Sequence, residues 1–182
     1  MRACAYVVGP EEGFSGALKD VARHLGFEAV QRYRDLPQAE RQLLATPLVF
    51  FLFAATDDLR KIKPVTEAIR FSSNARLRFS PMIYFSDSAS IETIRTCINL
   101  GFDDIITLPF TLKRLEERLD RQLDRPLVYY QTPTYFGPDR RGRLDPDEGQ
   151  HFRGTDGEYR RFEITRGPGG VHVLKDEVHV MI

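Results

Sequence analysis

Short apolar runs alternate with segments of helical period along the first two-thirds of the chain. The runs occupy residues 3–8, 27–33, 48–53, 82–85 and 105–107. Six consecutive large apolar residues at 48–53 are typical of a strand that is buried on both faces of a sheet, and hence of a central strand. Between the runs, apolar residues recur every three or four positions, which indicates amphipathic helices. This alternation predicts crossover units around a parallel sheet.

Glycine, proline and hydroxyl residues indicate where the predicted helices begin and end. We expect Ser15 and Thr111 to cap the first and last helices, because their side-chain oxygens can accept hydrogen bonds from the free N–H groups of a first turn. Gly101 follows a helical segment at a position that favours glycine. Pro64 interrupts the region after the third strand, so we expect the third helix over residues 65–71.

The pattern changes at Pro126, which closes the last predicted helix. Residues 127–130 form a brief strand-like run, and the prolines and glycine of 132–139 favour an extended chain over a helix. We therefore divide the chain into a domain over residues 1–125 and a C-terminal extension over residues 126–182.

The last part of the extension alternates with the period of a β-strand. Phe162 and Ile164 precede a glycine-rich turn, and valines recur at even spacing over 171–180, apart from one charged interruption. The pattern predicts a β-hairpin or three short strands, which are marginal alone and need cover from the rest of the chain or from a second copy. His172 and His179 fall on the face opposite the valines with no third ligand nearby, so we interpret them as surface residues rather than metal ligands.

Composition restricts the classes of function. The 182 residues include 26 Lys and Arg and 26 Asp and Glu, so the formal net charge is zero and no overall field attracts nucleic acid or an acidic membrane. No run approaches the ~18 apolar residues of a membrane span, and we expect a cytoplasmic protein that binds neither membrane nor DNA. Cys4 and Cys97 lie far apart in apolar segments, which indicates buried free thiols.

One segment is similar to the last strand-to-helix connection of response-regulator receivers. It reads Gly-Phe-Asp-Asp-Ile-Ile-Thr-Leu-Pro-Phe-Thr over residues 101–111 and contains the Pro109–Phe110 pair. Ser86 and Leu108 are 108 − 86 = 22 positions apart, as are the switch hydroxyl and the lysine of typical receivers. Over about its first two-thirds the chain thus resembles the receiver (CheY-like) family. The resemblance implies an α/β fold with a doubly wound, five-stranded parallel sheet in the flavodoxin-like order 2-1-3-4-5, here followed by a C-terminal β-rich arm.

The resemblance also shows what this chain lacks. Receivers hold a divalent metal with two acidic residues after the first strand, where this chain has Gly9 and Pro10. Leu52 takes the position of the phosphoacceptor aspartate, so the site has no nucleophile for phosphoryl transfer. Asp57 and Asp58 follow several residues later, and we interpret them as part of a solvated turn and helix start.

Two further receiver positions are changed. Leu108 replaces the lysine that pairs with the phosphoryl group, and Ile105 replaces the aromatic residue that moves with the switch hydroxyl. Ser86 alone of the usual set is kept, and hydrogen bonding within its turn or capping of the following helix is its simplest role. Receivers altered in this way usually act as protein-interaction modules, although a ligand-controlled variant is an alternative.

The extension carries a basic and aromatic cluster. The string Tyr-Phe-Gly-Pro-Asp-Arg-Arg at 135–141 looks like the tail of short bacterial receiver proteins. The candidate binding residues are Tyr135, Phe136, Arg140, Arg141 and Arg143. Such side chains could hold a cyclic dinucleotide or another nucleotide through bidentate phosphate contacts and stacking. They could equally pair with carboxylates on the first domain or on a second subunit, and the acidic residues between 139 and 148 favour this second role.

These observations lead to one functional prediction and one alternative. The sequence has no Ser-His-Asp order, no paired catalytic carboxylates at strand ends, no metal motif and no glycine-rich phosphate loop, so we expect neither an enzyme nor a cofactor. We predict a receiver-like protein of bacterial two-component signalling that works without phosphorylation. It would act by protein–protein interaction, its arm mediating self-association as a homodimer or docking of a partner protein. The alternative is a cyclic-dinucleotide or nucleotide effector that uses the arginine cluster.

Overall fold

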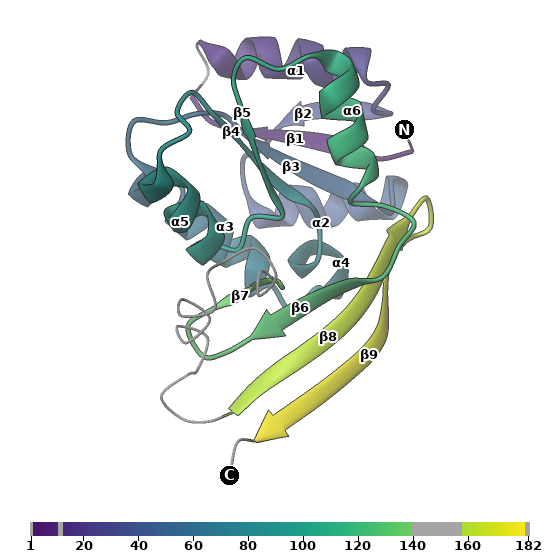
Figure 1. The fold of residues 1–182 in the computed structure, drawn as a ribbon. Helices are drawn as coiled ribbons and strands as arrows, with labels where there is room; N and C mark the ends of the chain where they lie inside the picture. The colour runs from purple at the N-terminus through teal and green to yellow at the C-terminus, as the bar shows by residue number, and fades with distance from the viewer. Residues whose placement is uncertain (1, 11–12, 140–157, 181–182) are drawn as a thin grey trace.

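A five-stranded parallel sheet forms the centre of the molecule (Figure 1). The structure, a computed structural model, describes residues 2–10, 13–139 and 158–180. The parallel strands are β1 (Cys4–Val8), β2 (Ala29–Arg32), β3 (Val49–Phe53), β4 (Met82–Ser86) and β5 (Asp104–Thr107). Their order is β2-β1-β3-β4-β5, and every residue of the central strand β3 is buried. Both the sheet order and the central place of the 48–53 run are therefore confirmed.

Helices cover both faces of this sheet (Figure 1). They are α1 (Phe14–His24), α2 (Leu36–Ala45), α3 (Lys63–Arg70), α4 (Ala75–Arg78), α5 (Ile91–Asn99) and α6 (Leu112–Asp120), with the 3-10 helix η1 (Leu59–Lys61) before α3. Helices α1 and α6 pack Leu18 and Leu115 against one face, and α2, α3 and α5 pack residues such as Leu43 and Ile69 against the other. Cys4 and Cys97 are buried free thiols, as predicted.

The helix ends confirm most of the predicted signals and correct two, the cap at Ser15 and the start of the third helix, which is Lys63 and not residue 65. Thr111 caps α6 by accepting a hydrogen bond from the Arg114 N–H at 3.2 Å, and Gly101 follows α5 with a φ of 78°. Ser15 does not cap α1. The N-cap is Gly13 and the helix begins at Phe14, one residue before Ser15. The Ser15 side chain is buried in the first turn with no hydrogen-bond partner among the described residues. Pro64 lies in the first turn of α3, where its missing N–H has no helical partner to lose.

The C-terminal extension forms a second, antiparallel sheet. Its strands are β6 (Leu127–Gln131), β7 (Phe136–Pro138), β8 (Glu158–Gly167) and β9 (Gly170–Val180), in the order β7-β6-β8-β9. The predicted hairpin is the β8–β9 pair, which contains a register shift at Glu163/Ile164. The strand-like run at 127–130 forms β6, and the stretch at 132–139, which we expected to be merely extended, contributes β7. We call this four-stranded unit the C-terminal sheet and residues 1–125 the body.

The C-terminal sheet packs against the body at one edge of the parallel sheet (Figure 1). Phe79 lies just before β4 and belongs to a buried cluster with Tyr129, Phe136, Phe162 and Ile164 of the C-terminal sheet. Because parallel strands share one direction, this contact lies at the edge where the strands begin, which we call the amino edge. The carboxyl edge, where receivers carry their phosphorylation site, is therefore on the opposite side. No helix in the described part of the chain is both long and apolar enough to cross a membrane.

Candidate functional site

The first loop of the carboxyl edge is closed by tight packing around Gly9. This residue follows β1 with a φ of 156°, and a Cβ atom placed on it would lie 2.6 Å from Ser15 Oγ and 2.9 Å from Ala54 Cβ. Contacts this short exclude any side chain unless the backbone moves. The position that the receiver resemblance assigns to a metal-binding carboxylate therefore has no room for one. Pro10, the next residue, is exposed.

The third strand presents no oxygen ligand to this edge. Leu52 is 1% exposed and packs in the core beneath α1 and α6. Asp58 lies in the turn after β3, where its carboxylate accepts hydrogen bonds from the Arg60 backbone N–H at 3.0 Å and from Arg60 Nε at 2.9 Å. These hydrogen bonds to Arg60 lower the pKa of Asp58. Asp57 beside it is exposed. Both carboxylates thus belong to a solvated turn that caps η1, as the sequence indicated.

The three remaining receiver-like positions take part in local hydrogen bonds or packing. The Ser86 hydroxyl donates a hydrogen bond to the Ser88 carbonyl at 2.6 Å and accepts one from the Ser88 N–H at 3.2 Å. This is the turn role that we considered simplest. Leu108 is half-buried, and its N–H donates to the Ser86 carbonyl at 2.9 Å. Ile105 in β5 is half-buried against the core.

A cleft of about 620 Å³ opens between the loops that follow β3 and β4. Its walls include Thr56, Asp57, Tyr84, Ser86 and Asp87. Within the described ranges, no three His, Cys, Asp or Glu side chains are grouped so that they could hold a metal ion. The cleft is therefore an open, partly acidic surface feature beside the closed Gly9 loop.

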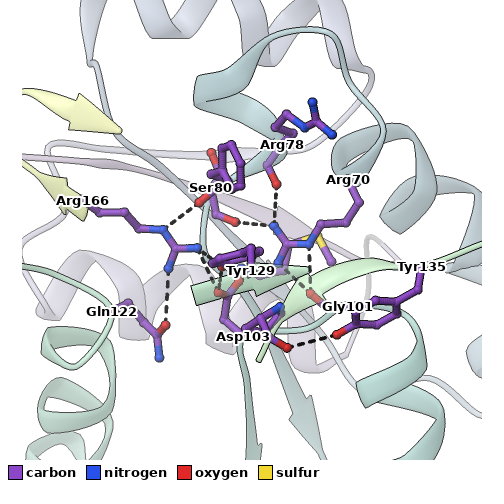
Figure 2. A network of polar contacts seen from close by, with 12 residues as sticks. Arg70, Arg78, Ser80, Gly101, Asp103, Gln122, Tyr129, Tyr135 and Arg166 are labelled. Carbon is purple, nitrogen blue, oxygen red and sulfur yellow. Dashed lines mark hydrogen bonds and ion pairs between the residues drawn. The ribbon is translucent and has the colours of Figure 1, made fainter. Parts of the chain in front are cut away.

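The most unusual chemistry of the molecule lies at the amino edge, where a single carboxylate meets two arginines (Figure 2). Asp103, just before β5, accepts Arg70 Nη2 at 2.6 Å on Oδ2 and Arg166 Nη2 at 2.9 Å on Oδ1. All three side chains are at most 2% exposed. Arg70 ends α3 in the body, whereas Arg166 comes from β8. The ionic contact therefore joins the body to the C-terminal sheet.

The remaining donors of this cluster are also satisfied. Arg70 donates to the carbonyl oxygens of Gly101, Arg78 and Ser80 at 2.7 to 2.9 Å. Arg166 donates from Nε to the Phe79 carbonyl at 2.6 Å and from Nη1 to Gln122 Oε1 at 3.4 Å. The Tyr129 hydroxyl of β6 donates to Asp103 Oδ1, and the Met82 N–H donates to Oδ2 at 2.8 Å. Backbone carbonyl dipoles thus help to compensate two buried guanidinium charges that share one carboxylate.

The charge of this site is tuned by its surroundings. Burial alone would raise the pKa of Asp103, but the charges of Arg166 and Arg70 outweigh burial and lower it from 3.8 to about 2. Burial raises the pKa of the Tyr129 hydroxyl, so this group stays protonated and able to donate. The cluster is consequently a pre-formed ionic joint rather than a group poised to exchange protons at neutral pH.

A pH dependence of stability follows from the lowered pKa of Asp103. The unfolded chain binds the Asp103 proton more readily than the folded protein, so this contribution is present above about pH 4 and is lost as the pH falls toward 2. Its size is on the order of 2 kcal/mol. We expect the difference in unfolding free energy between the wild type and Asp103→Asn to shrink over this range in urea titrations. A difference that stays constant from pH 5 to pH 2.5 would contradict the assignment.

Sequence reasoning missed this cluster, although one signal for it exists. In the alternation of β8, Arg166 falls on the same face as Phe162 and Ile164, which point into the core. A charged residue in an apolar strand face requires a buried partner of opposite charge. The sequence does not reveal that partner, because Asp103 is 63 positions away and lies in the segment that resembles receivers.

The predicted binding residues of the extension occupy different environments. Tyr135 and Phe136 are 8% and 2% exposed, and the Phe136 ring packs against the rings of Phe79 and Phe162 at centroid distances of 5.2 and 5.8 Å. Neither ring therefore presents an open face for stacking on a base. The cluster's arginines, Arg140, Arg141 and Arg143, lie outside the described residues. The nucleotide hypothesis stays a prediction that the structure does not test.

Comparison with known proteins places the fold. Neither a protein-family model nor a characterised protein matches the chain by sequence. Among solved structures, a protein described as pilus assembly-related from Burkholderia pseudomallei matches 66% of this chain and 88% of its own, with 17% identity and a TM-score of 0.50. A response regulator from Thermotoga maritima matches 65% of this chain and 96% of its own, with 18% identity and a TM-score of 0.48. A signal receiver domain from Bermanella marisrubri matches 65% and 95%, with 16% identity and a TM-score of 0.47. At these identities the likeness concerns the fold alone, and the sheet order 2-1-3-4-5 that the resemblance implied is the order found in the structure.

Proposed function

We propose that this chain is a receiver-like signalling protein that acts through protein–protein contacts and does not depend on phosphorylation. The observation that carries the proposal is the closed loop at Gly9, where Ser15 and Ala54 fill the space that a metal-binding carboxylate needs. Leu52 and Leu108 add no charge to the same edge. At Gly9 and Leu108 a phosphoryl group would therefore find neither the metal-binding carboxylate nor the lysine of a typical receiver.

The C-terminal sheet supports an interaction role. One face of this sheet packs against the body through the aromatic cluster and the Asp103 joint. Strand β9 nevertheless leaves large apolar side chains exposed, with Leu174 at 52%, Val178 at 60% and Val180 at 66%. Exposed apolar groups gathered on one strand are typical of a contact surface. We propose that this strand mediates self-association or the docking of a partner protein.

Incubation with acetyl phosphate and Mg²⁺ tests the independence from phosphorylation. We expect the intact mass of the protein to stay unchanged, because Leu52 supplies no nucleophile and, among the residues that the structure describes, no three His, Cys, Asp or Glu side chains are grouped so that they could hold a metal ion. A receiver that retains its acidic residues, treated in parallel, serves as the positive control for the reagent. A stable adduct of one phosphoryl group on this chain, mapped to Asp57 or Asp58, would overturn this part of the proposal.

A further inference from the structure

The C-terminal sheet has one covered edge and one open edge. At the β7 edge, a Cβ atom placed on Gly137 would lie 2.8 Å from Gly101 Cα of the body, so the body lies directly against this strand. At the other edge, β8 is the one strand that pairs with β9 within the described residues. Residues 172–178 of β9 are all exposed. The N–H and C=O groups on the outer side of this strand can therefore pair with an additional strand.

The alternation of side chains limits how β9 could pair with β9 of a second copy. Residues that face each other in an antiparallel pair lie on the same face of the sheet, whereas neighbours along a strand lie on opposite faces. A two-fold axis between two such strands must therefore lie level with one residue of each strand, so that this residue faces its own copy. It cannot lie level with the peptide bond between two residues. Each candidate axis then fixes which side chains oppose each other.

An axis through Asp176 gives a complementary set of pairs. Lys175 lies opposite Glu177 of the second copy, and Glu177 opposite the second Lys175. Leu174 lies opposite Val178, again twice. An axis at Lys175 or Glu177 instead places the Asp176 carboxylate against an apolar residue, Leu174 or Val178. Among the central residues of β9, Asp176 is thus the one axis position at which charged residues face opposite charges and apolar residues face apolar residues.

Contacts within one chain already prepare these pairs. On the outer face of the C-terminal sheet, Lys175 Nζ lies 3.3 Å from Glu163 Oε2 and Arg161 Nη1 lies 3.2 Å from Glu177 Oε2. Across the axis, the row would read Glu163, Lys175, Glu177, Arg161, with alternating sign over four strands. The two Asp176 carboxylates would meet at the axis, and each is already neutralised by a bidentate contact with Arg160 at 2.6 Å.

We propose that two copies of the chain join edge to edge through antiparallel pairing of β9 about a two-fold axis at Asp176, which would form a continuous eight-stranded sheet. The inference rests on the proposed self-association and names its surface and register. The charges and the register shift of β9 also have a second effect, because they oppose pairing with unrelated strands. Charges that exclude most partners while matching one register give specificity.

Charge reversal and mixing test this seam. In Lys175→Glu or Glu177→Lys alone, both cross-axis pairs become like-charged, and we expect dimerisation to weaken by at least about tenfold in sedimentation equilibrium. An equal mixture of the two variants restores opposite charges at both pairs, so the mixture should form heterodimers. The matched controls Lys113→Glu and Glu116→Lys make the same changes of charge on exposed positions of α6 and should dimerise like the wild type.

A second measurement is independent of charge. Facing Cα atoms of an antiparallel pair lie about 4.5–5.5 Å apart, within the range of a disulfide. Asp176→Cys should therefore form a disulfide-linked dimer under mild oxidation, whereas His172→Cys, away from the axis, should not. Cys4 and Cys97 are buried and should not interfere.

The outcomes separate this inference from the broader proposal. A dimeric wild type that neither charge variant weakens would overturn the β9 seam and leave self-association standing. A wild type that is monomeric at high micromolar concentration would overturn both the seam and the self-association. The charges of β9 would then serve only to oppose pairing of this edge with other strands. Neither result bears on the acetyl phosphate experiment.

Discussion

Replacing Asp103 with asparagine should lower the free energy of unfolding by about 3–5 kcal/mol, the usual cost of removing one partner from a buried ion pair. The loss is large because Arg70 and Arg166 would remain at most 1% exposed without a carboxylate between them. The carbonyl oxygens around them supply dipoles but no compensating charge. Urea unfolding followed by circular dichroism measures the change, provided that the denaturant slope stays that of the wild type.

Asp104→Asn is the matched control for this prediction. It makes the same chemical change one residue along the chain, where Arg118 is the one arginine paired with Asp104 in the described part of the chain and is 25% exposed. Because water can reach that guanidinium, we expect a loss of only about 1 kcal/mol. Equal losses for the two variants would mean that the Asp103 joint contributes no more than the partly exposed Asp104–Arg118 pair.

The parallel sheet could be predicted from the sequence because its signals are local. The buried run at 48–53 marks the central strand, and Thr111 and Gly101 mark helix ends through the conformations of one or two residues. Ser15 shows the limit of such signals. A serine near a helix start favours capping, but the Ser15 side chain packs beside Gly9 in the core instead.

The docking of the C-terminal sheet could not be predicted in the same way. Its hairpin follows from period-two alternation, but the choice between the body and a second copy as its cover depends on contacts between distant segments. The deciding residues, Arg70, Asp103 and Arg166, span almost a hundred positions, and nothing local to any of them identifies the other two. The leucines and the glycine at receiver-like positions could be interpreted from the sequence, because the resemblance to receivers supplied residues with which to compare them. For the Asp103 joint at the amino edge, the resemblance supplied no such comparison.

The position of that joint bears on how the extension could work. The carboxyl edge and the amino edge lie on opposite sides of the parallel sheet, so a contact that fixes the C-terminal sheet does not cover the carboxyl edge (Figure 1). The extension is therefore better understood as an added layer of the body than as an arm that reaches a second subunit with its inner face. Under the proposal above, association through the extension would use the outward-facing surface of the C-terminal sheet, including the exposed strand β9.

Truncating Phe162 to alanine should destabilise the protein by about 3–5 kcal/mol, the range for removing a buried aromatic ring. Phe162 is 3% exposed, and its ring lies 5.2 Å from that of Phe79 and 5.8 Å from that of Phe136. It therefore contacts both the body and its own sheet. If the two parts unfold as one unit, thermal unfolding of Phe162→Ala should show a single transition, displaced to lower temperature, by both circular dichroism and tyrosine fluorescence.

Tyr159→Ala removes an aromatic ring from the opposite face of the same strand and serves as the control. Tyr159 is half-buried and stacks on His179, away from the body. Its loss should cost about 1 kcal/mol, since the ring stays partly in water and leaves no closed cavity. Two separate transitions in Phe162→Ala, the later one at the wild-type temperature, would mean that the body folds without its C-terminal sheet. The Asp103 joint would then be a consequence of docking, because a body that is stable alone does not need Arg166 to hold it together.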